Sequence, residues 1–392
     1  MTILVNGQSK TTLATRPYQV CKRCVMDTTD PEIQFDENGI CNHCRGYEAQ
    51  SQRLVIPESK RQTVLDRLVT EIRARGKGRE YDCVIGVSGG VDSTYVAYLV
   101  KKLGLRPLAV HLDNGWDSEL AVGNIEKILR KLGIDLYTHV LDWEEFKQLQ
   151  LAFLKASTPD SEVPTDHAIS AILYREAAKR KVPYLIIGVN TATEGIHASR
   201  WSYGLNDWRY INAVNSRFGA CALRNFPHYS LFDMFNYSLF KKIQLVRILD
   251  YIQYNKQEAM RILESELGWR PYGGKHYESI YTRFFQGYIL PQKFSIDKRK
   301  MHLSALIMSG QIAREQALSE LHNPPYSGYM MEEDMEYVLK KFGLTQEEFQ
   351  SIMAKPVRSY KDFPNSERLF TIIRNLQVTT LMRKLKLMPA KS

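Results

Sequence analysis

One stretch of the sequence, DCVIGVSGGVDSTYVAYL over residues 82–99, constrains the fold more than any other. Its apolar beginning, residues 82–87, is typical of a strand that is covered on both faces. Apolar residues then recur at helical spacing over residues 92–103. The glycines between the two segments let backbone N–H groups come close to an anion, and the N-terminus of the helix adds its positive end. We therefore expect an α/β domain with a phosphate-binding turn.

The turn between this strand and helix is made of Ser88, Gly89, Gly90, Val91, Asp92 and Ser93. The hydroxyl groups of Ser88 and Ser93 can donate to phosphate oxygens. Bare phosphate would repel Asp92, so its carboxylate fits only if a cation such as magnesium lies between them. The turn is therefore predicted to bind magnesium-bound phosphate, with Ser88, Asp92 and Ser93 in catalytic roles.

Two common phosphate-binding motifs are missing, because the chain has no GxxxxGK[ST] and no GxGxxG follows a predicted strand. SGGVDS instead resembles the pyrophosphate loop (PP-loop) of the N-type ATP pyrophosphatases. These enzymes cleave ATP between the α and β phosphates and adenylate an oxygen. The resemblance implies a parallel sheet of the adenine nucleotide α-hydrolase type. An ordinary turn between a strand and a helix is the alternative.

Three further strands are predicted within residues 106–116, 136–142 and 182–195. Parallel sheets bind ligands at the carboxyl ends of their strands, so Asp113, Asn114 and Gly188 are expected beside the nucleotide. The GVNTATE segment, residues 188–194, resembles the GTxNxxE segment of ammonia-dependent NAD synthetases. This implies that Glu194 binds magnesium and that Asn190 contacts substrate. Valine replaces the threonine of that segment, and Asn190 falls one place early.

Four cysteines near the N-terminus form two pairs, CKRC and CNHC, at Cys21, Cys24, Cys41 and Cys44. The 16 residues between the pairs suit two knuckles that close one tetrahedral zinc site. Four thiolates leave no position for water, so the zinc would be structural. Two disulfides are the alternative, but they need an oxidising compartment.

Composition places the chain among soluble proteins. The first 17 residues lack the apolar core of a signal peptide, and no run of eighteen apolar residues exists, so a cytoplasmic location is expected. The formal net charge of +10 suits an anionic partner, either nucleic acid or a phosphorylated substrate, although solubility alone would also explain it.

Adenylation prepares a carbon for attack by sulfur or by nitrogen. Thiolation of transfer RNA would need further cysteines, but only Cys83, within a predicted buried strand, and Cys221 remain. Nitrogen is therefore favoured, with a transfer RNA thiolation enzyme as the alternative and a nucleotide-binding regulator without turnover as a third class. The chain shows no glutaminase motif, so ammonia would come from a separate subunit or from solution.

Four segments together resemble the N-acetyl sugar amidotransferase family: the cysteine segment, SGGVDST, GVNTATEG and residues 268–300. The resemblance extends over roughly residues 18–390. The family acts in pathways of bacterial surface polysaccharides, such as the lipopolysaccharide O-antigen, and of flagellar sugars. Membership implies conversion of an acetamido group on a sugar, free or UDP-linked, to an acetamidino group, with release of AMP and pyrophosphate. It also implies ATP, Mg²⁺ and structural Zn²⁺, and as partners a class I glutaminase and a cyclase-like protein that channels ammonia. Nucleic acid is not expected as a partner.

The sequence divides into a flexible N-terminus (1–17), a zinc module (18–50), a connecting helix and basic linker (51–80), a PP-loop domain (81–238) and a mainly helical region (239–392). Residues 240–255 have helical spacing, and Lys242 resembles the lysine that meets phosphate in related synthetases. The basic residues Lys298 and Arg299 could bind pyrophosphate or nucleotide. Residues 198–219 are expected to form a long loop over the active site. The candidate sugar contacts in this loop are Arg200, Trp201 and Arg209.

Overall fold

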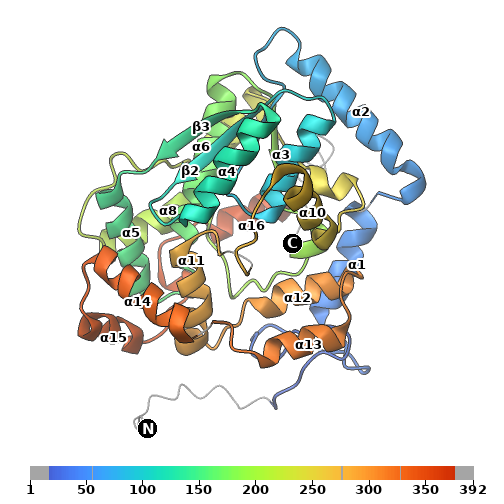
Figure 1. The fold of residues 1–392 in the computed structure, drawn as a ribbon. Helices are drawn as coiled ribbons and strands as arrows, with labels where there is room; N and C mark the ends of the chain where they lie inside the picture. Colours follow the sequence, from blue (N-terminus) through green and yellow to red (C-terminus); the bar gives the residue numbers. More distant parts are fainter. Residues whose placement is uncertain (1–16, 55, 275–276, 327, 376–392) are drawn as a thin grey trace.

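The computed structural model describes residues 17–54, 56–274, 277–326 and 328–375 (Figure 1). The first sixteen residues of the predicted flexible N-terminus lie outside these ranges. Five parallel strands form one sheet in the order β3-β2-β1-β4-β5. They are β1 (Cys83–Gly86), β2 (Pro107–Asp113), β3 (Asp135–Val140), β4 (Tyr184–Ile187) and β5 (Gln244–Arg247). The predicted parallel α/β fold is therefore confirmed, with the PP-loop strand β1 at the centre of the sheet.

Helices surround this sheet and form most of the remaining structure. Up to the end of β4 they are α1 (Asn42–Leu54), α2 (Glu58–Gly76), α3 (Val91–Lys102), α4 (Glu119–Leu132), α5 (Trp143–Ala156) and α6 (Val163–Lys179). Beyond β4 they are α7 (Thr191–Glu194), α8 (Trp208–Phe218), α9 (Leu231–Phe235), α10 (Lys256–Ile262), α11 (Ile280–Phe284), α12 (Arg299–Met308), α13 (Arg314–His322), α14 (Gly328–Phe342), α15 (Gln346–Ala354) and α16 (Glu367–Asn375). Short π- and 3₁₀-helices are η1 (Asn236–Phe240), η2 (Ile248–Tyr251), η3 (Leu263–Leu267), η4 (Phe285–Phe294) and η5 (Tyr360–Asp362). Within the described ranges, no helix combines the length and the apolar character needed to cross a bilayer.

The central strand is covered on both faces, as its apolar sequence predicts. Cys83 and Ile85 point into one core, which contains side chains of α2, α3 and α4. Val84 points into the other core, which contains side chains of α5 and α6. Successive residues of a strand face opposite sides, so each face of β1 needs its own helical layer. This arrangement leaves the carboxyl edge of the sheet open to the loops that build the site.

Two predictions of secondary structure are wrong. Residues 244–247 form β5, which pairs with β4, whereas helix was predicted over 240–255. The sheet thus continues past the boundary predicted at residue 238, while the rest of the division stays a prediction. Residues 208–218, expected within a loop, form α8, because Asp207 caps the helix by accepting from the amides of Arg209 and Tyr210.

The cysteine segment packs against the C-terminal helices and is not a separate appendage. Figure 1 shows the blue N-terminal segment and α1 beside the orange α12 and α13. The Arg314 guanidinium donates to the backbone carbonyls of Cys21 and Cys24, at 2.8 and 3.1 Å. The ammonium group of Lys300 lies 2.5 Å from the buried carboxylate of Asp27. The cysteine segment therefore packs directly on α12 and the start of α13.

Candidate active site

The PP-loop closes tightly between β1 and α3. Gly89 has a φ of +79°, and a Cβ there would lie 2.9 Å from the carbonyl oxygen of Ala121, so only glycine fits without strain. The hydroxyl oxygens of Ser88 and Ser93 are 3.1 Å apart, and the Ser88 amide donates to Ser93 Oγ. The first amides of α3 have no carbonyl partner inside the helix and face the same side. Backbone and hydroxyl donors thus converge as a phosphate site requires.

A second glycine, Gly188, lets the end of β4 approach this loop. A Cβ at Gly188 would lie 2.9 Å from the amide nitrogen of Ser93 and 3.0 Å from the carbonyl carbon of Asp92. Glycine is therefore required here by close packing of two backbones. Its predicted contact with nucleotide stays a prediction.

Two aromatic side chains from a distant segment hold the PP-loop in place. The indole Nε1 of Trp269 and the hydroxyl of Tyr272 both donate to the carbonyl oxygen of Gly89, at 3.0 and 2.8 Å. The carboxylate of Glu278 also lies near, because a Cβ on Gly90 would be 3.4 Å from its Oε1. Trp269, Tyr272 and Glu278 were not assigned to the site from the sequence, and they form one side of the loop's surroundings.

The carboxylate of Asp92 points from α3 toward the turn after β4. It accepts hydrogen bonds from the hydroxyl of Tyr254 and, at 3.4 Å, from Thr193. Burial and the charge of Asp92 raise the pKa of Tyr254 well above its usual range, so the phenol stays protonated and donates. The charge of Glu194 adds to the same effect on the pKa of Tyr254. That Asp92 and Glu194 hold magnesium stays a prediction.

The short helix α7, which carries Glu194, is fixed from several directions. Asn190 is fully buried and caps it, accepting from the amide of Thr193 and donating to the carbonyl of Gly188. Arg247 at the end of β5 donates to Thr191 Oγ1, at 2.9 Å. The predicted substrate contact of Asn190 is therefore wrong, because capping occupies its side chain.

Helix α12 supports α7 from the other side. His302 Nδ1 lies 3.0 Å from the carbonyl oxygen of Thr193, and the hydroxyl of Ser309 donates to the carbonyl of Ala192 at 2.9 Å. On its opposite side, the hydroxyl of Ser304 accepts from the backbone amide of Val25 in the cysteine segment. Helix α12 thus connects the cysteine segment to the turn that carries Glu194.

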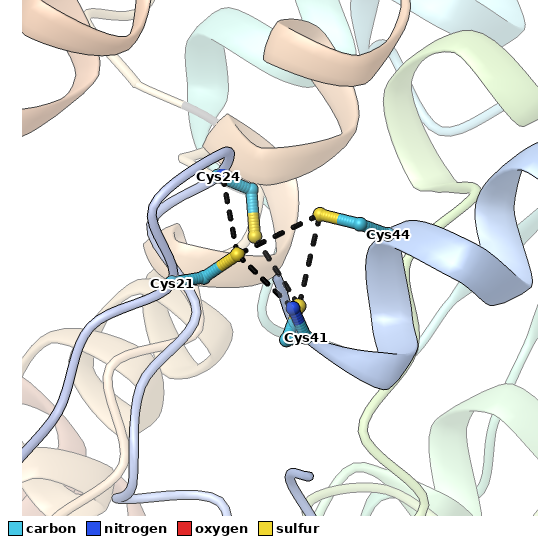
Figure 2. Close-up of side chains that lie close together, drawn as sticks. All are labelled: Cys21, Cys24, Cys41 and Cys44. Carbon is cyan, nitrogen blue, oxygen red and sulfur yellow. Dashed lines mark hydrogen bonds between the residues drawn. The ribbon is translucent and has the colours of Figure 1, made fainter. Parts of the chain in front are cut away.

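The four predicted zinc ligands lie together and form the group that could hold a metal ion within the described residues. Figure 2 shows their sulfur atoms turned toward one another between a loop and the start of α1. The sulfur atoms are 3.8 Å apart in the pair Cys21–Cys44, 3.6 Å in Cys24–Cys41 and 3.7 Å in Cys41–Cys44. Tetrahedral zinc with Zn–S bonds of about 2.3 Å requires about 3.8 Å, whereas a disulfide requires about 2 Å. The geometry fits zinc and excludes the disulfide alternative.

Three carboxyl groups that sequence reasoning missed lie at the start of α6. Asp160 and Glu162 are buried, and Asp166 lies one turn further along the helix. Burial raises the pKa of Glu162 to about 8 and that of Asp166 to about 7. The acids crowded in DSEVPTD, residues 160–166, were the available signal, but their burial could not be read from the sequence.

The raised pKa of Glu162 predicts that the free energy of unfolding depends on pH. An unfolded Glu162 loses its proton near 4.5, whereas the folded one keeps it to about 8, so stability falls as pH rises through this window. Glu162→Gln removes that loss. We expect the Tm of the variant minus that of wild type to be higher at pH 8 than at pH 5 by at least about 2 °C. Thermal unfolding at both pH values measures this, and an equal difference at both would contradict it.

Two predicted basic phosphate ligands are wrong. Lys242 precedes β5, and its carbonyl accepts from Arg75, so it lies at the amino edge of the sheet, opposite the PP-loop. The guanidinium of Arg299 pairs with Asp297 and donates to the carbonyls of Glu320 and Asn323, which ties α12 to the end of α13. Lys298 is different, because its ammonium group faces Asp160 at 4.0 Å and remains near the site.

The structure places the predicted sugar contacts and the residues at the end of β2 in different surroundings. Trp201 is only 1% exposed, so a role at the sugar surface is wrong for it. Arg200 pairs with Glu32 of the cysteine segment at 2.6 Å, and Arg209 is exposed in the first turn of α8. Asp113 ends β2 and Asn114 follows it, as predicted, but both side chains accept hydrogen bonds from backbone amides of the next turn. Contacts of Arg200, Arg209, Asp113 and Asn114 with ligand stay predictions.

Cys221 lies in a hollow of about 470 Å³ at the start of α5. Asp142, Glu144 and Glu145 line this hollow, and burial with their charges raises the pKa of the Cys221 thiol. A persulfide carrier needs an accessible thiolate, which acidic surroundings disfavour. Cys83 is completely buried, and burial raises the pKa of its thiol as well.

Comparisons with known proteins found similarity over parts of the chain. Residues 278–377 match the C-terminal domain of LPS biosynthesis proteins described as WbpG-like. A glutamine-hydrolyzing GMP synthase of Pyrobaculum aerophilum is 44% identical over 73 residues, 18% of this chain and 14% of that protein. The tRNA-specific 2-thiouridylase MnmA of Pediococcus pentosaceus is 32% identical over 99 residues, 22% of this chain and 26% of that protein. The chain thus spans about a quarter or less of these two relatives. A solved NH3-dependent NAD synthetase of Campylobacter jejuni is 18% identical with a TM-score of 0.28, covering 53% of this chain and 84% of that one.

The SGGVDS turn after the central strand of a parallel sheet, together with these relatives, defines a PP-loop protein of the N-type ATP pyrophosphatase class. The match to the WbpG-like C-terminal domain covers residues 278–377, which lie within the region that resembles the N-acetyl sugar amidotransferases.

Proposed function

We propose that this protein is an ATP-dependent amidotransferase that converts the acetamido group of an N-acetylated sugar, free or UDP-linked, to an acetamidino group. One observation carries the proposal: a PP-loop with Asp92 turned toward the Glu194 turn is joined in one chain to a WbpG-like C-terminal domain. The loop suits release of pyrophosphate, and the domain points to lipopolysaccharide sugars.

The reaction has two steps. The acetamido oxygen attacks the α-phosphorus of ATP, pyrophosphate leaves, and an imidoyl adenylate forms. Ammonia then adds to the carbon, and loss of AMP leaves the amidine. In the first step Ser88, Ser93 and the first amides of α3 would bind the departing pyrophosphate, which positions ATP and stabilises developing charge.

Metal ions would have separate roles. Asp92 and Glu194 would hold magnesium, which neutralises charge on the pyrophosphate when it is bound. The four cysteines would hold zinc, which stabilises the segment that packs on α12. Ammonia would come from a separate class I glutaminase through a cyclase-like channelling protein.

Product analysis tests this function. With ATP, magnesium, ammonium and a diacetamido UDP-sugar, we expect one AMP per sugar converted and a loss of about 1 Da in sugar mass, because NH replaces O. Mass spectrometry of the sugar and chromatography of the nucleotides measure both. AMP formation without a change in sugar mass, or neither, would exclude the reaction.

The similarity to MnmA favours one second candidate, a transfer RNA thiolation enzyme. That function predicts sulfur incorporation that depends on Cys221, and RNA binding that weakens steeply with salt. Cys221→Ser should leave amidination unchanged under our proposal, because the thiol has no part in it. Loss of sulfur transfer in this variant would favour the alternative.

A further inference from the structure

A buried histidine of β2, His111, lies directly behind the PP-loop. Its side chain is almost completely buried, since the residue is 7% exposed. Its Nδ1 atom lies 3.0 Å from the carbonyl oxygen of Val87, the residue that precedes the loop. Its Nε2 atom lies 3.1 Å from Oδ2 of Asp117, in the turn before α4. The imidazole therefore joins the end of the central strand to that turn, and no role was assigned to it from the sequence.

The two partners of His111 fix its charge. The carbonyl oxygen of Val87 and the carboxylate of Asp117 can only accept hydrogen bonds. A neutral imidazole has one N–H group and would leave one of these oxygens facing an unprotonated nitrogen. Only the imidazolium, with two N–H groups, satisfies both. An aspartate ordinarily loses its proton near pH 3.9, far below the pKa of an imidazolium, so the shared proton stays on the ring.

The charges near His111 favour the same state. Burial alone lowers the pKa of this histidine, but the hydrogen bond to Asp117 and the charge of that carboxylate raise it. The carbonyl of Val87 and the charge of Asp113, at the end of the same strand, act in the same direction. The net result is a pKa above the ordinary value of 6.5, so the imidazolium persists at neutral pH.

The contact with Val87 controls one peptide group of the PP-loop. The carbonyl of the peptide between Val87 and Ser88 accepts from His111, and its N–H donates to Ser93 Oγ at 3.2 Å. In a trans peptide these two groups point in opposite directions, so the peptide is held from both sides. Ser93 Oγ also lies 3.1 Å from Ser88 Oγ. His111 thus acts, through one peptide, on the two hydroxyl groups predicted to meet phosphate.

The contact with Asp117 extends this connection to the C-terminal part of the chain. Asp117 forms an antiparallel bridge with Ser279. The next amide, that of Ser118, donates to the carbonyl of Glu278 at 2.8 Å. Ser279 and Glu278 are the first residues of the segment that matches the WbpG-like domain. The pair of His111 and Asp117 therefore lies between the PP-loop and the start of this domain.

We infer that the imidazolium of His111, held by Asp117, is a positioning group for ATP: it fixes the orientation of the PP-loop and places positive charge behind the phosphates that the loop binds. A charge inside a protein acts over a longer distance than a hydrated one, because the surroundings screen it less. His111 acts through the peptide that follows Val87 and has no part in bond making. The inference rests on ATP binding by the PP-loop, which belongs to the proposed function, and is independent of the identity of the sugar.

Nuclear magnetic resonance tests the charge of His111 without ATP or sugar. In full-length protein labelled with ¹⁵N-histidine, we expect both ring nitrogens of His111 to be protonated at pH 7. His111→Asn, which lacks this signal, identifies it among the nine histidines. Asp117→Asn removes the negative partner and should lower the titration midpoint of His111 by about one pH unit or more. A neutral His111 in the wild-type protein at pH 7 would overturn the inference.

Calorimetric titration with Mg·ATP tests the effect on nucleotide binding. His111→Asn keeps a neutral donor close to the position of Nδ1 and removes the charge and the contact with Asp117. We expect its Kd for Mg·ATP to rise about tenfold or more, as for loss of a charge-assisted hydrogen bond. Should this variant not fold, Asp117→Asn is expected to show a smaller rise. His322→Asn, the same change at an exposed position of α13, should keep the wild-type Kd.

The pH dependence of binding separates a role of the charge from a purely structural one. A group whose pKa is raised contributes fully below that pKa and loses its contribution as pH rises through it. The affinity of wild-type protein for Mg·ATP should therefore fall as pH rises through the midpoint of His111, and His111→Asn should lack this fall. An unchanged Kd in folded His111→Asn, or the same fall in both proteins, would overturn the inference and leave the proposed function standing. Absence of Mg·ATP binding by wild-type protein would overturn both, whatever the charge of His111.

Discussion

Asp92→Asn is expected to abolish pyrophosphate release while leaving the fold intact. Asparagine keeps the size of the side chain and one oxygen, which can accept from Tyr254, while its amide nitrogen can donate to the hydroxyl oxygen of Thr193. It removes the negative charge that a magnesium ligand must supply. Loss of a group that stabilises transition-state charge costs about 10²–10³-fold, and we expect at least about 10³-fold here because the metal is lost with it. A coupled assay of pyrophosphate release measures the rate, and Tm measures the fold.

Asp66→Asn provides the control, because it makes the same chemical change on the exposed face of α2. It should keep full activity. Release of pyrophosphate by Asp92→Asn within tenfold of wild type, at an unchanged Tm, would show that Asp92 does not hold magnesium in the reaction.

The sequence was sufficient for the PP-loop and the inner strands of the sheet, because their signals are local. Apolar residues on both faces of β1, the two glycines and the start of α3 lie within one short segment. Backbone geometry supports the choice of glycine, since Gly89 has a positive φ and contacts Ala121 closely. The four cysteines were equally readable, because the spacing within each pair already fixes two ligands on one turn.

β5 and α8 were harder to predict, each for a physical reason. β5 has only one neighbour, β4, so its residues are half exposed and its apolar spacing is also compatible with a helix. Lys242 was assigned to the phosphate through its resemblance to a lysine of related synthetases, and the direction of β5 places it at the amino edge of the sheet. Helix α8 had a readable signal, the cap at Asp207, which the aromatic composition around it obscured.

Contacts between distant segments could not be predicted from one sequence. Tyr254 meets Asp92 across 162 residues, and Trp269 meets Gly89 across 180. The same holds for Glu162, whose partner Thr282 lies 120 residues away. Each of these residues modifies the site through its packing, and packing becomes visible only when the fold is known.

Cys21→Ser is expected to remove zinc and to unfold the N-terminal segment, residues 18–50. Structural zinc contributes about 10–16 kcal/mol in isolated modules, which is as large as the net stability of a typical domain. The segment has few apolar residues to replace that contribution. We expect less than about 0.2 zinc per chain by metal analysis, a lower Tm and reduced solubility.

The same change should also slow pyrophosphate release, although Cys21 is not near phosphate in sequence or in role. Ser304 of α12 and Arg314 at the start of α13 would lose their backbone partners in the cysteine segment. Helix α12 would then be less firmly held. Because His302 and Ser309 of that region hold the turn that bears Glu194, a displaced α12 would weaken the magnesium site. Cys221→Ser, which changes a thiol outside the cluster, should keep both zinc and activity. One zinc per chain in folded Cys21→Ser would show that the cluster does not hold the metal, and full activity after zinc loss would show that α12 keeps its place without it.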